Sequence, residues 1–106
     1  LDIATDAILV HKVTGEILYW NKGAERMYGW STEEALSQNI YQLVYADGHS
    51  EKQEDILQAL TKSGSWQGEL RKINKHQQSI TVMSRRTLVK DEEGHVTSVL
   101  NVDRHY

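Results

Sequence analysis

The sequence predicts an α+β domain in which a five-stranded antiparallel sheet carries its helices on one face. Two observations predict this class. Strand signals lie at both ends of the chain, as apolar β-prone segments at the start and as alternation of apolar and polar residues in the last 40 or so residues, and helix start and stop signals fill the middle. The expected element order is two strands, four helices of which the last is the longest, and three strands. The 106 residues are expected to form one domain, 1–106, excised from a longer multidomain protein.

The chain opens with two short segments that have the composition of strands. Residues 6–12 (DAILVHK) and 16–20 (EILYW) are apolar and rich in β-prone residues. The turn between them contains Gly15, which suits a tight reversal. We therefore expect a β-hairpin.

Helix signals follow the hairpin directly. The side-chain oxygen of Asn21 can accept hydrogen bonds from the free amides of a helix over residues 22–28, and Gly29 is suited to end that helix. Ser31 and Glu34 have the spacing of a capping box, in which each side chain bonds the backbone amide of the other. A second helix is expected to begin there.

Two more helical segments are expected before the strands resume. Residues 40–45 form a short apolar turn, and a weaker capping box at 50–53 precedes a longer helix that Gly64 ends. One face of the longer helix is expected to pack on a flat surface. That face is made by Ile56, Leu57 and Leu60.

The last part of the chain changes to strand periodicity. Strands are expected over residues 66–74, 79–90 and 95–103, joined by the polar turns NKHQQ and DEEG. The basic pairs at 71–72 and 85–86 are expected on a solvated strand face. In the strands at 66–74 and 79–90, the side chains expected to share the buried face are Trp66, Gly68, Leu70, Ile80, Val82, Ser84 and Leu88.

Composition excludes several classes of function. The chain has no cysteine, which rules out disulfides, thiol nucleophiles and thiolate metal sites. A net charge of −3 disfavours nucleic-acid binding, and no segment approaches the ~20 apolar residues of a membrane span. The five histidines lack metal-ligand spacing, and no nucleophile–base pair is evident. We expect a cytoplasmic domain with no metal, no catalytic residues, no nucleic-acid partner and no direct membrane contact.

Several motifs in order carry a family resemblance. AILVHKVTGEILYWN followed by GAERMYGWSTEEAL resembles the PAS domain pattern of a glycine-centred hairpin, an asparagine, and a helix ending in Gly-aromatic-Ser/Thr-x-x-Glu. SGSWQGELRKINK is similar to the family's Gly-x-Trp-x-Gly-Glu strand, and DEEGHVTSVLNV to its closing hairpin. The resemblance covers nearly the whole chain and implies the PAS-like fold, a five-stranded antiparallel sheet flanked by helices.

The resemblance implies a non-catalytic sensory module that binds a small ligand or mediates dimerisation. Such a module passes its signal to an effector further along the same chain, most often a two-component histidine kinase, and forms homodimers through flanking helices. Asp103 matches the family's output aspartate when a gap is allowed, whereas an ungapped alignment places His105 there. Two alternatives stay open: a cofactor-free dimerisation or protein-interaction module, and a small α+β enzyme.

The resemblance also sets expectations for cofactors. Ile40 stands where flavin-adduct photoreceptors carry their cysteine, and the lack of cysteine equally excludes a thioester-linked chromophore. Haem is disfavoured because Gln53 replaces the ligand histidine, with His49 four residues earlier. Non-covalent flavin stays open, since members that bind it carry a tryptophan like Trp66, and so does a small metabolite or organic acid.

A ligand between helices and sheet would contact inward side chains from both layers. For each apolar member of this set, ordinary core packing is the alternative. The candidate pocket residues are Tyr28, Trp30, Ile40, Leu43, Ile56, Leu60, Trp66, Leu70, Val82, Ser84 and Asn101, with Asp103 as the candidate signal-output residue.

Overall fold

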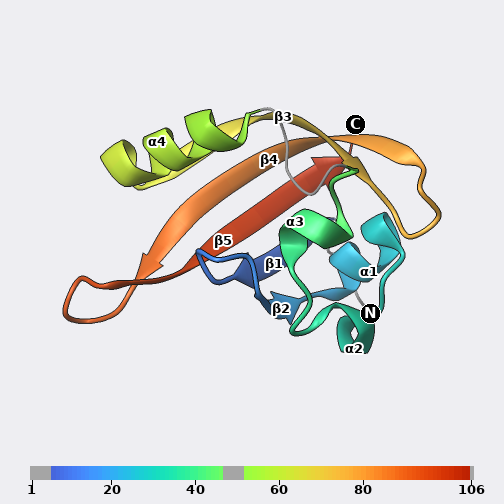
Figure 1. Cartoon of the computed structure of the whole chain (residues 1–106), viewed down its shortest axis with the longest axis horizontal. Helices are drawn as coiled ribbons and strands as arrows, with labels where there is room; N and C mark the ends of the chain where they lie inside the picture. The colour runs from blue at the N-terminus through green and yellow to red at the C-terminus, as the bar shows by residue number, and fades with distance from the viewer. Residues whose placement is uncertain (1–5, 47–51, 106) are drawn as a thin grey trace.

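The computed structural model describes residues 6–46 and 52–105 and contains one five-stranded antiparallel sheet in the order β2-β1-β5-β4-β3 (Figure 1). The fold class and the order of elements are as predicted. The strands are β1 (Ala7–His11), β2 (Ile17–Trp20), β3 (Ser65–Ile73), β4 (Ser79–Lys90) and β5 (Val96–His105). The helices are α1 (Lys22–Tyr28), α2 (Thr32–Ala35), α3 (Ile40–Leu43) and α4 (Gln53–Ser63).

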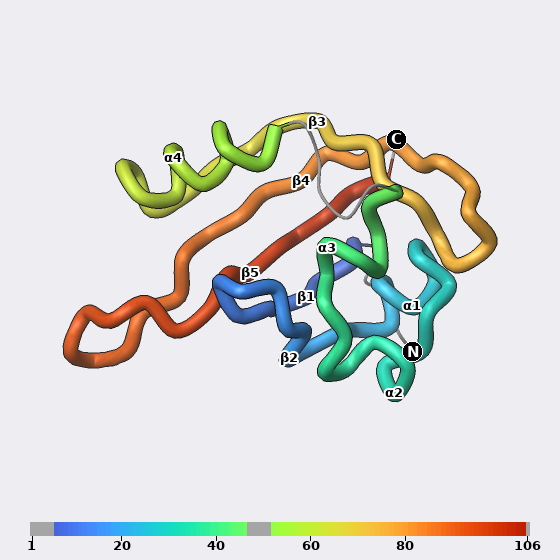
Figure 2. Tube along the Cα trace, in the orientation of Figure 1, coloured from blue at the N-terminus to red at the C-terminus, as the bar shows by residue number. Residues whose placement is uncertain are grey.

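The helices form two groups over the sheet. Helices α1 to α3 gather beside β1 and β2, and α4 lies along β3 and β4 (Figure 2). Both groups pack on the same face of the sheet. Val99, which packs with α4, is opposite His11 in the β1–β5 pairing, so the two side chains lie on one face. Leu9, beneath α1, is two residues from His11 on β1 and therefore lies on that face too. The core between sheet and helices therefore consists of two adjoining clusters.

Asn21 joins the hairpin to α1 as predicted, and does more than cap the helix. Its Oδ1 accepts hydrogen bonds from the Ala24 amide in α1 at 2.8 Å and from the Ile8 amide in β1 at 2.9 Å. Helix α1 ends at Gly29, whose φ of +81° is a left-handed conformation that glycine adopts without strain. One side chain thus fixes the helix start and its position against β1.

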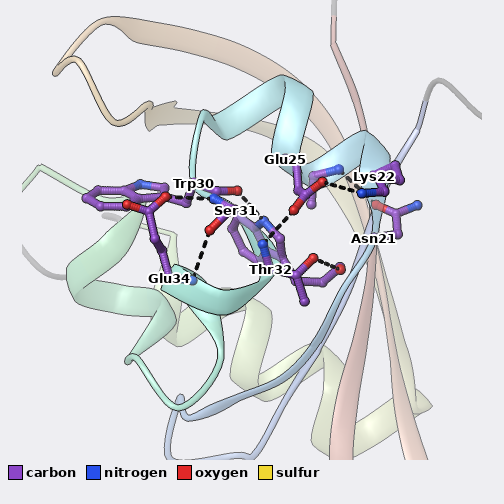
Figure 3. A network of polar contacts seen from close by, with 9 residues as sticks. Asn21, Lys22, Glu25, Trp30, Ser31, Thr32 and Glu34 are labelled. Atoms are coloured by element: carbon purple, nitrogen blue, oxygen red, sulfur yellow. Dashed lines mark hydrogen bonds and ion pairs between the residues drawn. The ribbon is translucent and has the colours of Figure 1, made fainter.

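The capping box at the start of α2 is confirmed. Ser31 Oγ accepts from the Glu34 amide at 3.1 Å, and Glu34 accepts from the Ser31 amide at 2.9 Å. Figure 3 shows how α1 contributes to the same junction, where Glu25 accepts from the Thr32 amide at 2.6 Å. The bend between α1 and α2 is therefore held by side chains from both helices.

Replacing Asn21 with alanine is expected to destabilise the domain by about 2 kcal/mol, because two backbone amides lose their acceptor. Replacing Ser31 with alanine removes one exposed cap and is expected to cost about 0.5 to 1 kcal/mol. Urea unfolding followed by circular dichroism measures both changes. Equal losses in the two variants would contradict the double role of Asn21.

The longer helix departs from the prediction at two points. Helix α4 begins at Gln53 with Lys52 in the N-cap position and no side-chain cap bond, so the helix starts after the expected capping box. Ser50 and Glu51 of that box, and His49, lie outside the described residues. Leu57 is 54% exposed while Ile56 and Leu60 are buried, because Leu57 lies about 100° around the helix from Ile56 and turns away from the sheet.

The prediction that both basic pairs lie on a solvated strand face is wrong for one member of each. Arg71 and Arg85 are exposed, but Lys72 and Arg86 are buried on the face that the helices cover. Successive strand residues point to opposite faces, so adjacent charged residues cannot both face solvent when the other face is covered. Two cations are thereby placed in the core.

Candidate functional site

The helix-covered face of the sheet carries a continuous set of buried polar side chains. Arg86 is the register partner of Asn101, and Ser84 is the register partner of Asp103, so these four side chains share one face of β4 and β5. Each member of the set is at most 1% exposed. We call this set the buried polar band, and it consists of His11, Lys72, Ser84, Arg86, Asn101 and Asp103.

Asp103 is the centre of one half of the band. Its Oδ2 accepts hydrogen bonds from Lys72 Nζ at 2.7 Å and from Tyr28 Oη at 2.5 Å. Burial by itself would raise the pKa of Asp103, but the Lys72 charge and the hydrogen bonds outweigh it and hold this pKa below its usual value. Burial and the adjacent carboxylate raise the pKa of Tyr28 well above its usual value. Asp103 is therefore an anion and Tyr28 a neutral donor at neutral pH.

Arg86 is the centre of the other half. Its Nη2 donates a hydrogen bond to Tyr45 Oη, a neutral acceptor from the segment that follows α3. Within the part of the chain that the structure describes, no carboxylate lies within 4 Å of Arg86 and no group bonds its Nε. The carboxylate of Asp103 is already bonded to Lys72. Arg86 is thus a buried cation without an ion-pair partner among the described residues.

His11 adds a buried hydrogen-bond acceptor beside Arg86. Its Nδ1 lies 2.7 Å from the Lys12 carbonyl oxygen, which only accepts, so Nδ1 carries the proton and Nε2 is the acceptor. Burial, together with the positive charges of Arg86 and Lys72, lowers the pKa of His11 to about 4. His11 is therefore neutral at pH 7, and among the described residues nothing bonds its Nε2.

A cavity of about 30 Å³ lies between α3, α4, the end of β1 and the parts of β4 and β5 nearest their connecting turn. Three of its lining residues, His11, Gln53 and Arg86, each have a buried nitrogen or oxygen that no described group bonds. Unsatisfied buried polar atoms are rare in proteins, and each calls for a partner such as a bound water, an ion or a ligand. The remaining lining residues are Val13, Tyr41, Ile56, Leu57, Leu60, Leu88 and Val99.

The structure distributes the predicted pocket residues over both core clusters. Only Ile56 and Leu60 line the cavity, while Ser84 and Asn101 belong to the buried polar band. Tyr28 and Ile40 are buried in the cluster beneath α1 to α3, with Trp30 and Leu43 packed against it. Leu70 and Val82 are buried in the cluster beneath α4, with Trp66 packed against it. Contact of these residues with a ligand stays a prediction.

The sequence reasoning missed four residues of the buried polar band and its hydrogen-bond partners: His11, Tyr45, Lys72 and Arg86. The alternation that placed Leu70 and Ser84 inward continues two residues later to Lys72 and Arg86. That signal was sufficient to place both cations in the core. It was overridden by the expectation that adjacent basic residues are solvated.

Among residues 6–46 and 52–105, no three histidine or carboxylate side chains gather as metal ligands would. None of the helices that the structure describes has the length and apolar character needed to cross a membrane.

Comparisons with known proteins show which fold family the sequence matches. Residues 1–102 match the PAS fold family. The PAS domain of a protein from Colwellia psychrerythraea superposes with a TM-score of 0.88 at 28% sequence identity, covering 99% of this chain and 89% of the other. No curated protein matches the sequence.

Two more distant structures share the fold. A PAS domain from a two-component sensor histidine kinase has a TM-score of 0.79 at 19% identity, covering 98% of this chain and 87% of its own. An RNA-binding Light-Oxygen-Voltage receptor has a TM-score of 0.80 at 20% identity, with 97% of this chain matching 30% of the receptor. The same architecture therefore also occurs as part of a larger receptor.

Proposed function

Because the chain belongs to the PAS family, we propose that it is a non-catalytic sensory domain that binds a small ligand in its core and passes the signal to an effector. The observation that carries this proposal is the buried polar band. Replacing a buried ion pair with apolar residues of similar volume is often neutral or stabilising, so stability alone does not account for this band. Retaining Arg86 without an ion-pair partner among the described residues is costly, and a ligand that pairs with it offsets that cost.

The proposed signal path runs along β5. Asn101, beside Arg86 in register, and Asp103, bonded to Tyr28 and Lys72, lie on the same strand and the same face. A ligand that changes the charge near Arg86 acts on the field at Asp103, two residues nearer the end of β5. We assign Asp103 the output role on this basis, acting on an effector further along the chain.

A histidine kinase is the effector that we propose. The support is a solved PAS domain of the same fold from a two-component sensor histidine kinase. Such a sensor would act as a homodimer through helices that flank the domain.

A large cofactor does not fit the cavity that the structure shows. Pockets for drug-sized ligands enclose roughly 300 to 1,000 Å³, whereas the cavity at Arg86 has about 30 Å³. We therefore propose a small metabolite rather than flavin or haem. An absorption spectrum of freshly purified protein without visible bands would agree with this assignment, and flavin or haem bands would overturn it.

The ligand proposal is tested by native mass spectrometry of the purified chain and by a thermal-shift screen of small metabolites. We expect a bound small molecule, or a metabolite that raises the melting temperature in proportion to the logarithm of its concentration. Bare protein together with no stabilising compound would contradict ligand sensing.

The opposite sheet face favours a second candidate function, dimerisation without a ligand. Ile8 pairs with Val102 and Val10 pairs with Leu100, which places four half-buried apolar side chains together on the face away from the helices. A second copy could cover this surface. Analytical ultracentrifugation tests it, with dimers of the ligand-free chain as the expected result and a strict monomer as the contradicting one.

A further inference from the structure

We propose that the cavity at Arg86 binds one structural water molecule, which accepts a hydrogen bond from Arg86 and donates one each to His11 and Gln53. This inference goes beyond the proposed sensory function, because the water belongs to the ligand-free chain. It follows from three properties of the cavity: its volume, the donors and acceptors on its wall, and its charge.

The volume of the cavity suits a water molecule. A site for water needs at least roughly 10 to 15 Å³ and several polar partners. The cavity has about 30 Å³, which leaves room for no more than about two water molecules. Ile56, Leu60 and Val99 are buried apolar parts of its wall. A molecule of this size must therefore make its hydrogen bonds with the few polar atoms of the wall.

The polar atoms of the wall comprise one donor and two acceptors. Arg86 Nε carries a hydrogen that no described group accepts, and no described group donates to His11 Nε2 or Gln53 Oε1. His11 Nε2 can only accept, because the proton of this ring is on Nδ1, 2.7 Å from the Lys12 carbonyl oxygen. Water has two hydrogens for the two acceptors and a lone pair for the Arg86 hydrogen.

The charge of the site disfavours an ion in place of water. A halide ion would be attracted to Arg86, but it has no hydrogen for His11 Nε2 or Gln53 Oε1 and would be repelled by their lone pairs. A cation could bind these two acceptors, but it would lie beside the buried guanidinium, which has no carboxylate within 4 Å among the described residues. Only a neutral molecule that both donates and accepts satisfies all three atoms.

The water joins side chains from three elements of the fold. Gln53 is the first residue of α4, His11 is the last residue of β1, and Arg86 lies in β4. His11 Nε2 and Gln53 Oε1 are both acceptors, so only a shared donor can link them. Helix α4 has no side-chain cap, so this link also helps to hold its first turn. Under the proposed sensory function, a molecule that pairs with Arg86 displaces the water and thereby acts on the start of α4.

The test compares Gln53→Leu with Gln58→Leu, the same change at an exposed position of α4. In a high-resolution crystal structure of the unmodified chain, we expect one water within about 3.2 Å of Arg86 Nε, His11 Nε2 and Gln53 Oε1. Leucine at position 53 removes one acceptor and puts carbon in its place. We therefore expect the water to be retained in Gln58→Leu and lost in Gln53→Leu.

Nuclear magnetic resonance tests the same site in solution. The hydrogen on Arg86 Nε is expected to show a rotating-frame Overhauser cross peak to water in the unmodified chain and in Gln58→Leu, but not in Gln53→Leu. The sign of the cross peak separates contact with a bound water from hydrogen exchange. A signal relayed by the hydroxyl of Tyr45, which Arg86 also bonds, would survive in Gln53→Leu.

Urea unfolding verifies that Gln53→Leu is folded, and Gln53→Met serves if it is not. A cavity without a water peak, or a cross peak of equal size in Gln53→Leu, would overturn the inference. An ion or an organic molecule bonded to Arg86 Nε in the crystal would overturn it too, and the organic molecule would support ligand sensing. Ligand sensing fails separately, if native mass spectrometry and the thermal-shift screen find no bound or stabilising molecule.

Discussion

Replacing Asp103 with alanine is expected to destabilise the domain by about 3 to 5 kcal/mol at neutral pH. The carboxylate is completely buried and accepts hydrogen bonds from Lys72 and Tyr28. Its removal leaves a buried ammonium group and a buried hydroxyl without their acceptor. Urea unfolding measures the loss, with Asp55→Ala on the exposed surface of α4 as the matched control, expected to change stability by no more than about 0.5 kcal/mol.

A double variant separates the unpaired charge from the lost packing. Lys72→Met removes the cation that Asp103→Ala leaves behind, so the two changes together are expected to cost less than the sum of each alone, by about 1 to 3 kcal/mol. Additive losses would show that the pair is not energetically coupled. A loss below about 1 kcal/mol in Asp103→Ala alone would mean that Lys72 finds another acceptor.

The elements that the sequence predicted correctly depend on neighbours along the chain. Asn21 and Ser31 cap amides three residues ahead, and Gly29 and Gly64 end helices through their own backbone conformation. Such signals are complete within one helical turn, so no knowledge of the tertiary fold is needed to recognise them. Strand periodicity is local in the same sense, which is why the inward positions Leu70, Val82 and Ser84 were predictable.

The chemistry of the core depends on contacts between distant parts of the chain. The Tyr28–Asp103 bond joins residues 75 positions apart, and the bonds of Lys72 to Asp103 and of Arg86 to Tyr45 span 31 and 41 positions. Alternation could place each cation inward, but only the strand order β5-β4-β3 determines which group it meets. The cavity at Arg86 is likewise lined by residues of five separate elements, and no short motif encodes it.

The second large effect is expected from pH, through His11. Its pKa is about 4 in the folded protein and near 6.5 when exposed. Between these values the unfolded chain binds a proton that the folded protein excludes, so stability is fully present above about pH 6.5 and is lost as the pH falls toward 4. The loss due to His11 is about 2 kcal/mol between pH 7 and pH 5.

Between pH 7 and pH 5 the loss of stability due to His11 is separate from the losses due to the acidic groups. Lys75 and the Ser31 amide hold the pKa of Glu34 at about 2, and those of Glu25 and Asp103 are also lowered, so their linked losses begin only below about pH 4.5. Urea unfolding at pH 7 and pH 5 is expected to show the loss in the unmodified chain and in the exposed control His76→Gln, but not in His11→Gln. An equal loss in His11→Gln would assign the pH dependence to another group and remove the evidence that His11 is neutral in the core.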